Sequence, residues 1–199
     1  MPQIGLKNFH VASRTVSESQ GVKNVAFGTP AYVAPLISAN IDIEYAEGEL
    51  FGDDITLFSK KVFKNGTLAL NTSDLPESFI KDYLGARQTT NGIIVDSAED
   101  QQIECACGFE SEKANGATRY VWLLRVLFSI PSDAFTTKGD SITFNTPTIE
   151  GKIMEEIVED AAHRHVWRYR LDSDSTATGA SAAAAAWFNA VPTPSYPTT

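Results

Sequence analysis

Few residues in this sequence have the types and spacing that catalysis needs. A nucleophile and its base usually include a histidine, and His10, His163 and His165 all lie outside any recognisable nucleophile motif. The motif Gly-x-Ser-x-Gly does not occur, and the glycines between Gly21 and Gly28 are not followed by the Lys-Ser/Thr of a phosphate loop. We therefore predict that the chain is not an enzyme.

The two cysteines, Cys105 and Cys107, are separated by one residue. On a strand they would point to the same face, and two small buried apolar side chains are the favoured interpretation. A metal site would need further ligands, for which His163 and His165 have the same spacing. Nothing in the sequence places the two pairs together, so we predict no metal and no cofactor.

Adjacent carboxylates occur at Asp53-Asp54 and at Glu155-Glu156. Neighbouring side chains on a strand point to opposite faces, so neither pair is placed to share a proton as a catalytic dyad does. These carboxylates add to the case against an enzyme.

The bulk composition fits one ordinary domain. The chain has 199 residues, of which 43% are hydrophobic and 21% charged, and its formal net charge is −9. Such a chain is unsuited to holding nucleic acid, although it could repel or guide it. The first residues lack the apolar region of a signal peptide, and no run approaches the roughly 18 apolar residues of a membrane span. We expect a protein made and kept in a cytoplasm.

Alternation of apolar and polar residues dominates the chain and predicts a mainly antiparallel β fold. In one run Ile103, Cys105, Cys107 and Phe109 should face inward, and the nearly continuous apolar run 119–130 indicates a strand covered on both faces. The expected strands are residues 40–45, 62–71, 102–109, 119–130, 141–145, 148–154 and 163–171. The expected turns are Lys64-Asn65-Gly66, Asn91-Gly92, Asn115-Gly116 and Lys138-Gly139-Asp140.

Two helices are expected. Asp74 and Glu77 resemble a capping box at the start of an amphipathic helix over residues 74–84, and Gly85 stands where a helix would end. Near the C-terminus an alanine run predicts a second helix that ends before Pro192, followed by a mobile Pro/Thr tail over 192–199. Trp187 and Phe188 would anchor this segment, on either the chain's own domain or a neighbouring molecule. The domain division is thus 1–171 for the β-domain and 172–199 for a C-terminal arm.

Charge and hydrophobicity are unevenly distributed. Residues 42–54 carry six acidic side chains without Lys or Arg, and lysines follow at 60, 61 and 64. Such segregation is compatible with surfaces that meet complementary surfaces, or with an ordinary solvated acidic face. Residues 46–60 are long for a loop between two strands, and they are too apolar to face only water. The apolar residues in question are Leu50, Phe51, Ile55, Leu57 and Phe58.

Several stretches, in one order from about residue 4 to residue 171, resemble the major tail tube proteins of long flexible-tailed phages, particularly those of Gram-positive hosts. The similar stretches are Ile4-Gly-Leu-Lys-Asn-Phe, Gly66-Thr-Leu-Ala-Leu-Asn leading to Asp74-Leu, Leu84-Gly85-Ala86, Gly108-Phe-Glu-Ser-Glu-Lys-Ala-Asn-Gly, Arg119-Tyr-Val-Trp-Leu and Thr137-Lys-Gly-Asp-Ser-Ile-Thr-Phe-Asn-Thr-Pro-Thr-Ile-Glu-Gly151. Each stretch is weakly specific, and the resemblance rests on their order and spacing.

The resemblance implies an antiparallel β-sandwich or half-barrel with a flanking helix and a long hairpin loop. Subunits of that family form hexameric rings that stack into a tube with an acidic lumen, through which DNA passes without specific binding. Implied partners are further copies of the chain, a tape measure protein inside the tube, and tail terminator and distal tail or baseplate proteins. The implied location is the virion tail, after assembly in the host cytoplasm and without a membrane.

The resemblance also assigns roles to residues. The loop residues named above would make contacts between rings, and five acidic or polar residues on the strands would face the lumen. These five are Asp42, Glu44, Thr143, Thr148 and Glu150. Two alternatives remain open at this point. One is a related tube from a contractile secretion system, and the other is a carbohydrate-binding β-sandwich with Trp122, Trp167 and Trp187 as stacking platforms.

Overall fold

The computed structural model describes residues 1–132, 137, 145–160 and 162–193. The strands are β1 (Gln3–Ser19), β2 (Val22–Phe27), β3 (Ala31–Tyr32), β4 (Leu36–Gly52), β5 (Ile55–Thr72), β6 (Arg87–Gln88), β7 (Ile94–Val95), β8 (Cys105–Lys113), β9 (Thr118–Phe128), β10 (Thr148–Met154) and β11 (Arg168–Asp172). The helices are α1 (Glu77–Tyr83) and α2 (Ala180–Ala185).

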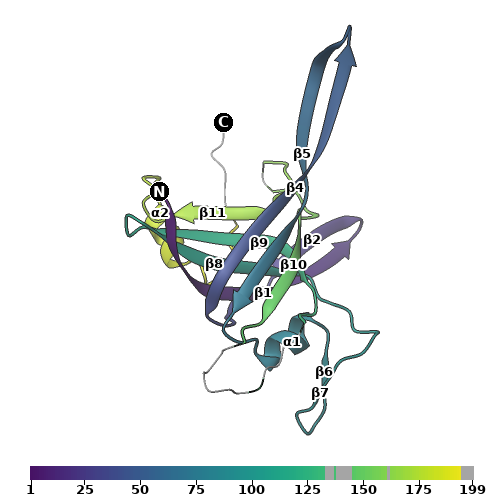
Figure 1. The fold of residues 1–199 in the computed structure, drawn as a ribbon, viewed down its shortest axis with the longest axis vertical. Helices are drawn as coiled ribbons and strands as arrows, with labels where there is room; N and C mark the ends of the chain where they lie inside the picture. Colours follow the sequence, from purple (N-terminus) through teal and green to yellow (C-terminus); the bar gives the residue numbers. More distant parts are fainter. Residues whose placement is uncertain (133–136, 138–144, 161, 194–199) are drawn as a thin grey trace.

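Nine of the described strands form one antiparallel sheet, and β6 and β7 form a separate hairpin (Figure 1). The order in the sheet is β2-β1-β8-β9-β10-β5-β4, with β11 also bonded to β9 and β3 to β1. The predicted mainly β, antiparallel fold with a flanking helix is confirmed.

The sheet has two halves, one with β8, β9 and β11 and the other with β4, β5 and β10. Side chains from both halves meet in the main core, called the first core here. In Figure 1, β8, β9 and β11 run across the direction of β4, β5 and β10. Leu68 and Leu70 of β5 and Val121 and Leu123 of β9 belong to the same buried cluster. Burying one such side chain contributes about 1.5–3 kcal/mol. The first core therefore joins the two halves into one body.

The opposite face of β8 and β9 carries a second core. Trp122 is fully buried there, together with Ala106 and Leu124. A side chain at Gly108 would place its Cβ only 2.7 Å from the Trp122 ring, so the indole requires glycine at that position. The prediction that β9 is covered on both faces is confirmed. The prediction that Ile103 faces inward is wrong, because this residue precedes β8 and its side chain is 46% exposed.

Helix α1 is shorter than predicted. It begins after Pro76, which is its N-cap, and no side chain caps its first turn. The predicted capping box is wrong, because Asp74 Oδ1 instead accepts a hydrogen bond from the backbone N–H of Leu75 at 2.8 Å. Gly85, with φ +88°, ends the helix as predicted. Phe79 is buried in the first core and fixes the helix to the sheet.

Two further predictions differ from the structure. The strand expected at 163–171 begins only at Arg168, and His163 has a φ of +56°, which a strand does not allow. The turn expected at Lys64-Asn65-Gly66 lies inside β5.

The turns at Asn91-Gly92 and Asn115-Gly116 are confirmed, with glycine φ values of 82° and 80°. Thr143, most of the expected strand 141–145, the turn at 138–140 and residues 194–199 lie outside the described residues.

Candidate assembly surfaces

The most prominent feature of the molecule is a hairpin that projects from the body (Figure 1). The prediction that residues 46–60 form a loop is wrong, because β4 and β5 continue through them and stay paired as far as Gly52 and Ile55. Asp53 and Asp54 form the two-residue turn, with φ values of 50° and 60°. Positive φ at both positions is the geometry of a type I′ turn, which suits the twist of a hairpin. Residues 45–63 are called the distal hairpin below.

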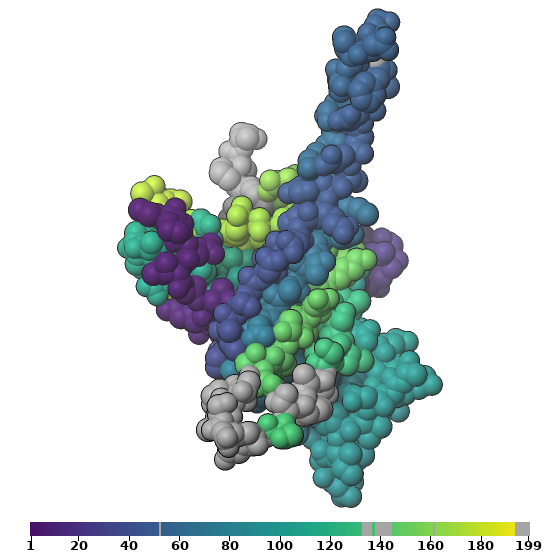
Figure 2. Space-filling model, viewed as in Figure 1, coloured from purple at the N-terminus to yellow at the C-terminus, as the bar shows by residue number. Residues whose placement is uncertain are grey.

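The distal hairpin leaves the sheet where β5 loses its second neighbour. The last pair between β10 and β5 is Ile153 with Gly66, and beyond it the described part of β5 pairs with β4 alone. The register also shifts between Glu44 and Tyr45, where Lys64 is the extra residue opposite them. A bulge of this kind bends a strand and increases its twist. Figure 2 shows the result as a narrow blue projection beyond the body.

The distal hairpin exposes large apolar side chains near its tip. Leu50 and Phe58 are register partners, so their side chains share one face, and they are 56% and 73% exposed. The other exposed apolar residues near the tip are Phe51, Ile55 and Leu57. A two-stranded hairpin without a covering layer is marginally stable in water. This surface therefore has the properties of one that gains stability from a partner.

The pairing of β4 with β5 brings some of the segregated charges into contact. Lys61 forms an ion pair with Glu47 across the two strands, and Lys64 Nζ lies 3.6 Å from Glu44 Oε2. Lys61 also lies over the ring of Tyr45, 4.8 Å from its centroid. Two of the six acidic residues in 42–54, Glu44 and Glu47, are thus paired with lysines of the same hairpin, and these pairs need no partner surface.

A polar face covers the outer side of β4, β5 and β10. The register places Asp42 beside Thr67, and Thr67 in turn beside Lys152. All three side chains are exposed. The face consists of Ser38, Asn40, Asp42, Glu44, Asn65, Thr67, Ala69, Asn71, Thr148, Glu150 and Lys152. Four of the five residues that the resemblance assigns to the lumen therefore lie on one face, and Thr143 lies outside the described residues.

The inner neighbours of this face explain why it stays polar. Ile41, Leu68 and Ile149 alternate with the exposed residues and point into the first core. On the outer side, Asn71 Nδ2 donates to Thr148 Oγ1 at 2.9 Å.

Strand β4 is the last strand in the sheet order, so one edge of its 17 residues is unpaired within the described chain. A long free edge is a site at which another chain can pair.

The C-terminal segment anchors on the chain's own body. Trp187 is 5% exposed in the second core, and its carbonyl accepts a hydrogen bond from Trp122 Nε1 at 3.0 Å. Phe188 stacks on His10 with 4.4 Å between ring centroids. The sequence left open whether Trp187 and Phe188 anchor on the chain's own domain or on a neighbouring molecule. In the structure both contact the chain's own domain. Burial of Trp122 and Trp187 also leaves neither indole free as a platform for a sugar.

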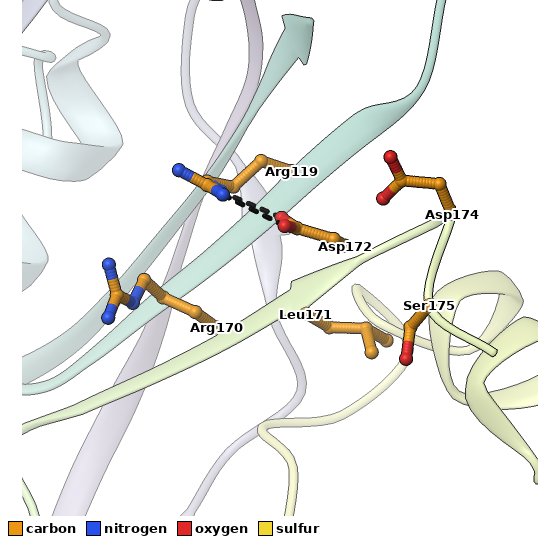
Figure 3. Close-up of a pocket in the computed structure, with 6 residues that line it drawn as sticks. All are labelled: Arg119, Arg170, Leu171, Asp172, Asp174 and Ser175. Atoms are coloured by element: carbon orange, nitrogen blue, oxygen red, sulfur yellow. Dashed lines mark hydrogen bonds and ion pairs between the residues drawn. The ribbon is translucent and has the colours of Figure 1, made fainter. Parts of the chain in front are cut away.

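The hollow beside β11 holds charged residues that neutralise one another (Figure 3). Arg119 donates two hydrogen bonds to Asp172, at 2.7 and 2.8 Å, and Lys113 bridges Asp172 and Asp174. The hydrogen bond from Arg119 is the largest cause that holds the pKa of Asp172 well below its usual range. In Figure 3 the side chain of Arg170 lies apart from the Arg119–Asp172 pair. A carboxylate held ionised in this way stabilises the fold and is a poor proton acceptor.

The cysteines and histidines that could bind a metal or take part in catalysis lie in different environments. Cys105 and Cys107 are buried in the first core, where burial raises the pKa of both thiols, whereas His163 and His165 are exposed. Within the described residues, no group of three or more His, Cys, Asp or Glu side chains is placed to hold a metal. None of the described helices is long and apolar enough to cross a bilayer.

An ion-pair network with a buried centre, called the buried ion-pair network below, connects four segments that are separate in the sequence. Arg14 of β1 binds Glu156 through Nε at 2.9 Å and through a second, shorter contact from Nη2. Arg14 Nη1 also binds Glu104 at 2.7 Å, and Arg125 of β9 binds Glu104 through both Nε and Nη2. The side chains of Arg14 and Glu156 are 2% and 8% exposed. Pairing over such separations carries no local sequence signal.

The sequence matches no model of a protein family, and no curated protein matches it.

Proposed function

We propose that this chain is the subunit of a phage-type tail tube, a structural protein without catalytic activity. The observation that carries the proposal is the distal hairpin, whose apolar tip lacks a covering layer in the described chain. Assembly would cover Leu50, Phe51 and Phe58 with a neighbouring subunit, as stacking between rings requires. The order of sequence stretches that resemble tail tube proteins supports the same proposal.

The polar face gives the proposed tube its lumen. DNA carries about one negative charge per 1.7 Å of duplex, and carboxylates repel it over roughly the Debye length of about 8 Å. Asp42, Glu44 and Glu150 stand against Lys152 and against Lys64, which pairs with Glu44, so one carboxylate per subunit is in excess and sixfold repetition would multiply it. The free edge of β4 would pair with a neighbour, so that the sheets of a ring join into one barrel. Within this proposal the bent sheet corresponds to the sandwich or half-barrel of the family.

The proposed setting follows from this role. The protein would be made in the host cytoplasm and would end in the virion tail as hexameric rings. Its partners would be further copies of itself, a tape measure protein in the lumen, and the terminator and distal tail proteins at the two ends. DNA would pass through without specific binding, and no cofactor would be needed.

Electron microscopy of paired variants tests the proposal. Phe51→Asp and Leu57→Asp place charges at the exposed tip, so the monomer should keep its circular dichroism spectrum and urea midpoint while tubes disappear. The matched control is Thr56→Asp, which adds the same charge beside Leu57 on β5 and opposite Phe51 without removing an apolar group. Negative staining of concentrated protein should show tubes of uniform diameter for wild type. Wild-type tubes that persist unchanged in both tip variants would refute the stacking role.

A further inference from the structure

The base of the distal hairpin contains a stack of side chains that no assembly role yet explains. Phe63, on the hairpin, lies parallel to Trp167 with 4.7 Å between ring centroids and 6° between ring planes. The guanidinium carbon of Arg168 also lies over the Trp167 ring, 4.2 Å from its centroid. Both rings are partly buried against the first core. This stack lies directly beyond the bulge at Lys64, where the hairpin leaves the sheet.

We propose that Phe63, Trp167 and Arg168 form an elbow that sets the direction of the distal hairpin relative to the body. A bulged two-stranded ribbon can bend and twist about its base, because beyond Gly66 no third described strand pairs with it. An aromatic stack restricts that motion, since a parallel ring pair resists tilting at one point of contact. Such a ring pair stabilises the contact beyond the burial of its surfaces, and an Arg over the indole adds a cation–π contact.

An elbow holds its direction only if its body side is rigid. The carbonyl of Trp167 accepts a hydrogen bond from Leu124 N at 3.1 Å, which ties the residue to β9. The preceding residue, Val166, accepts one from Glu156 N at 2.9 Å. The Glu156 carboxylate is the group that Arg14 holds in the buried ion-pair network. The network therefore holds in place the segment that carries Trp167 and Arg168.

This arrangement gives a reason for the buried ion pair. Replacing a buried ion pair by apolar residues is often neutral or stabilising, so such pairs are weak arguments for stability itself. Arg14 and Glu156 join β1 to the segment between β10 and β11, which has no strand ladder of its own among the described residues. The ion pair fixes that irregular segment in one geometry, and Trp167 takes its position from it. The inference deepens the proposed function, because the direction of the hairpin decides where its tip meets the next subunit.

Electron spin resonance distances on the isolated monomer test the elbow. Spin labels are attached in the double variant Ser59→Cys and Lys152→Cys, one on the hairpin and one on β10, both at exposed positions. The native Cys105 and Cys107 are buried with raised thiol pKa values, so they do not compete for the label. The otherwise unchanged protein should give one narrow distance distribution.

Variants of the stack decide the outcome. Phe63→Ala and Trp167→Ala should each broaden the distribution, and Trp167→Phe should restore most of its sharpness. The control Phe58→Ala, which removes an equal ring from the exposed tip, should leave the distribution narrow. Phe63 lies on the hairpin, so its variant remains informative if Trp167→Ala fails to fold.

Two results would overturn the elbow. One is a narrow, unshifted distribution in Phe63→Ala, and the other is equal broadening in the Phe58→Ala control. Because the measurement uses monomers, absence of tubes would count against the proposed function and leave the elbow standing.

Discussion

The body and the distal hairpin use the same strands in opposite ways. In the body, β4 and β5 point Ile41, Leu68 and Leu70 into the first core, and each polar neighbour faces water. In the hairpin, the same two strands expose Leu50 and Phe58, with no described layer above them. Buried and exposed apolar residues are thus separated along one pair of strands, at the bulge between Glu44 and Tyr45, and we propose that only the exposed set contacts a partner. Substitutions on either side of that bulge should therefore have different consequences.

The largest contrast is expected between two aromatic truncations. Trp122→Ala empties the second core and removes the hydrogen bond to the Trp187 carbonyl, so the free energy of unfolding should fall by about 3–5 kcal/mol. Phe58→Ala at the exposed tip should change it by less than about 0.5 kcal/mol. Urea unfolding followed by circular dichroism measures both. Comparable losses in the two variants would show that body and hairpin are not energetically separate.

The next largest effect concerns ion pairs. Glu156→Ala leaves Arg14 buried without its main partner, which should cost about 3–5 kcal/mol of unfolding free energy. The double variant Arg14→Met/Glu156→Leu should recover most of that loss, because it removes both charges. In the hairpin, Glu47→Ala breaks the exposed pair with Lys61 and should leave the urea midpoint unchanged. A Glu156→Ala protein as stable as wild type would contradict the buried pairing.

A smaller effect should appear at low pH and only in the body. The pKa of Asp172 is lowered in the folded state by Arg119 and Lys113, so the folded state binds its proton more weakly than the unfolded state. Its contribution is complete above the ordinary Asp pKa of about 3.9 and is lost as the pH falls below that value. Urea unfolding at pH 7, 5, 4 and 3 should show a shallower acid loss for Asp172→Asn. Identical pH profiles would argue against the pairing.

The smallest effect is expected at the hairpin turn. Asp53 and Asp54 both have positive φ, which costs less for an Asn-Gly pair, and they also place two like charges side by side. Replacing them by Asn and Gly should slow hydrogen exchange of hairpin amides near Leu50 and leave body amides unchanged. Faster exchange in the hairpin would mean that another geometry is preferred at the turn.

The sequence predicted features that depend on neighbours along the chain. Alternation located several of the strands, the nearly continuous apolar run predicted the two covered faces of β9, and glycine located the turns at Gly92 and Gly116. The same alternation identified the exposed side of residues 40–45. It did not reveal that residues 46–60 form two paired strands and a turn. Both strands expose apolar side chains, and an exposed apolar segment between two strands has the same sequence pattern as an apolar loop.

Features that depend on distant residues were not predicted. Arg14 and Glu156 are 142 residues apart, and Phe63 and Trp167 are 104 positions apart in the numbering. No local spacing connects such residues, so their pairing emerges only when the sheet bends. The capping box at Asp74 failed for the opposite reason, since a local alternative, the hydrogen bond to Leu75 N, was satisfied first.

The central claim, that this chain builds a tube through its distal hairpin, is tested most directly by electron cryo-microscopy of the concentrated protein, alone and with the proposed tail assembly partners. If the claim is correct, the images will show stacked sixfold rings in which the hairpin tip lies against the next ring and Asp42, Glu44 and Glu150 line the channel. A protein that stays monomeric under both conditions, or a tube whose channel is lined by another face, would contradict it.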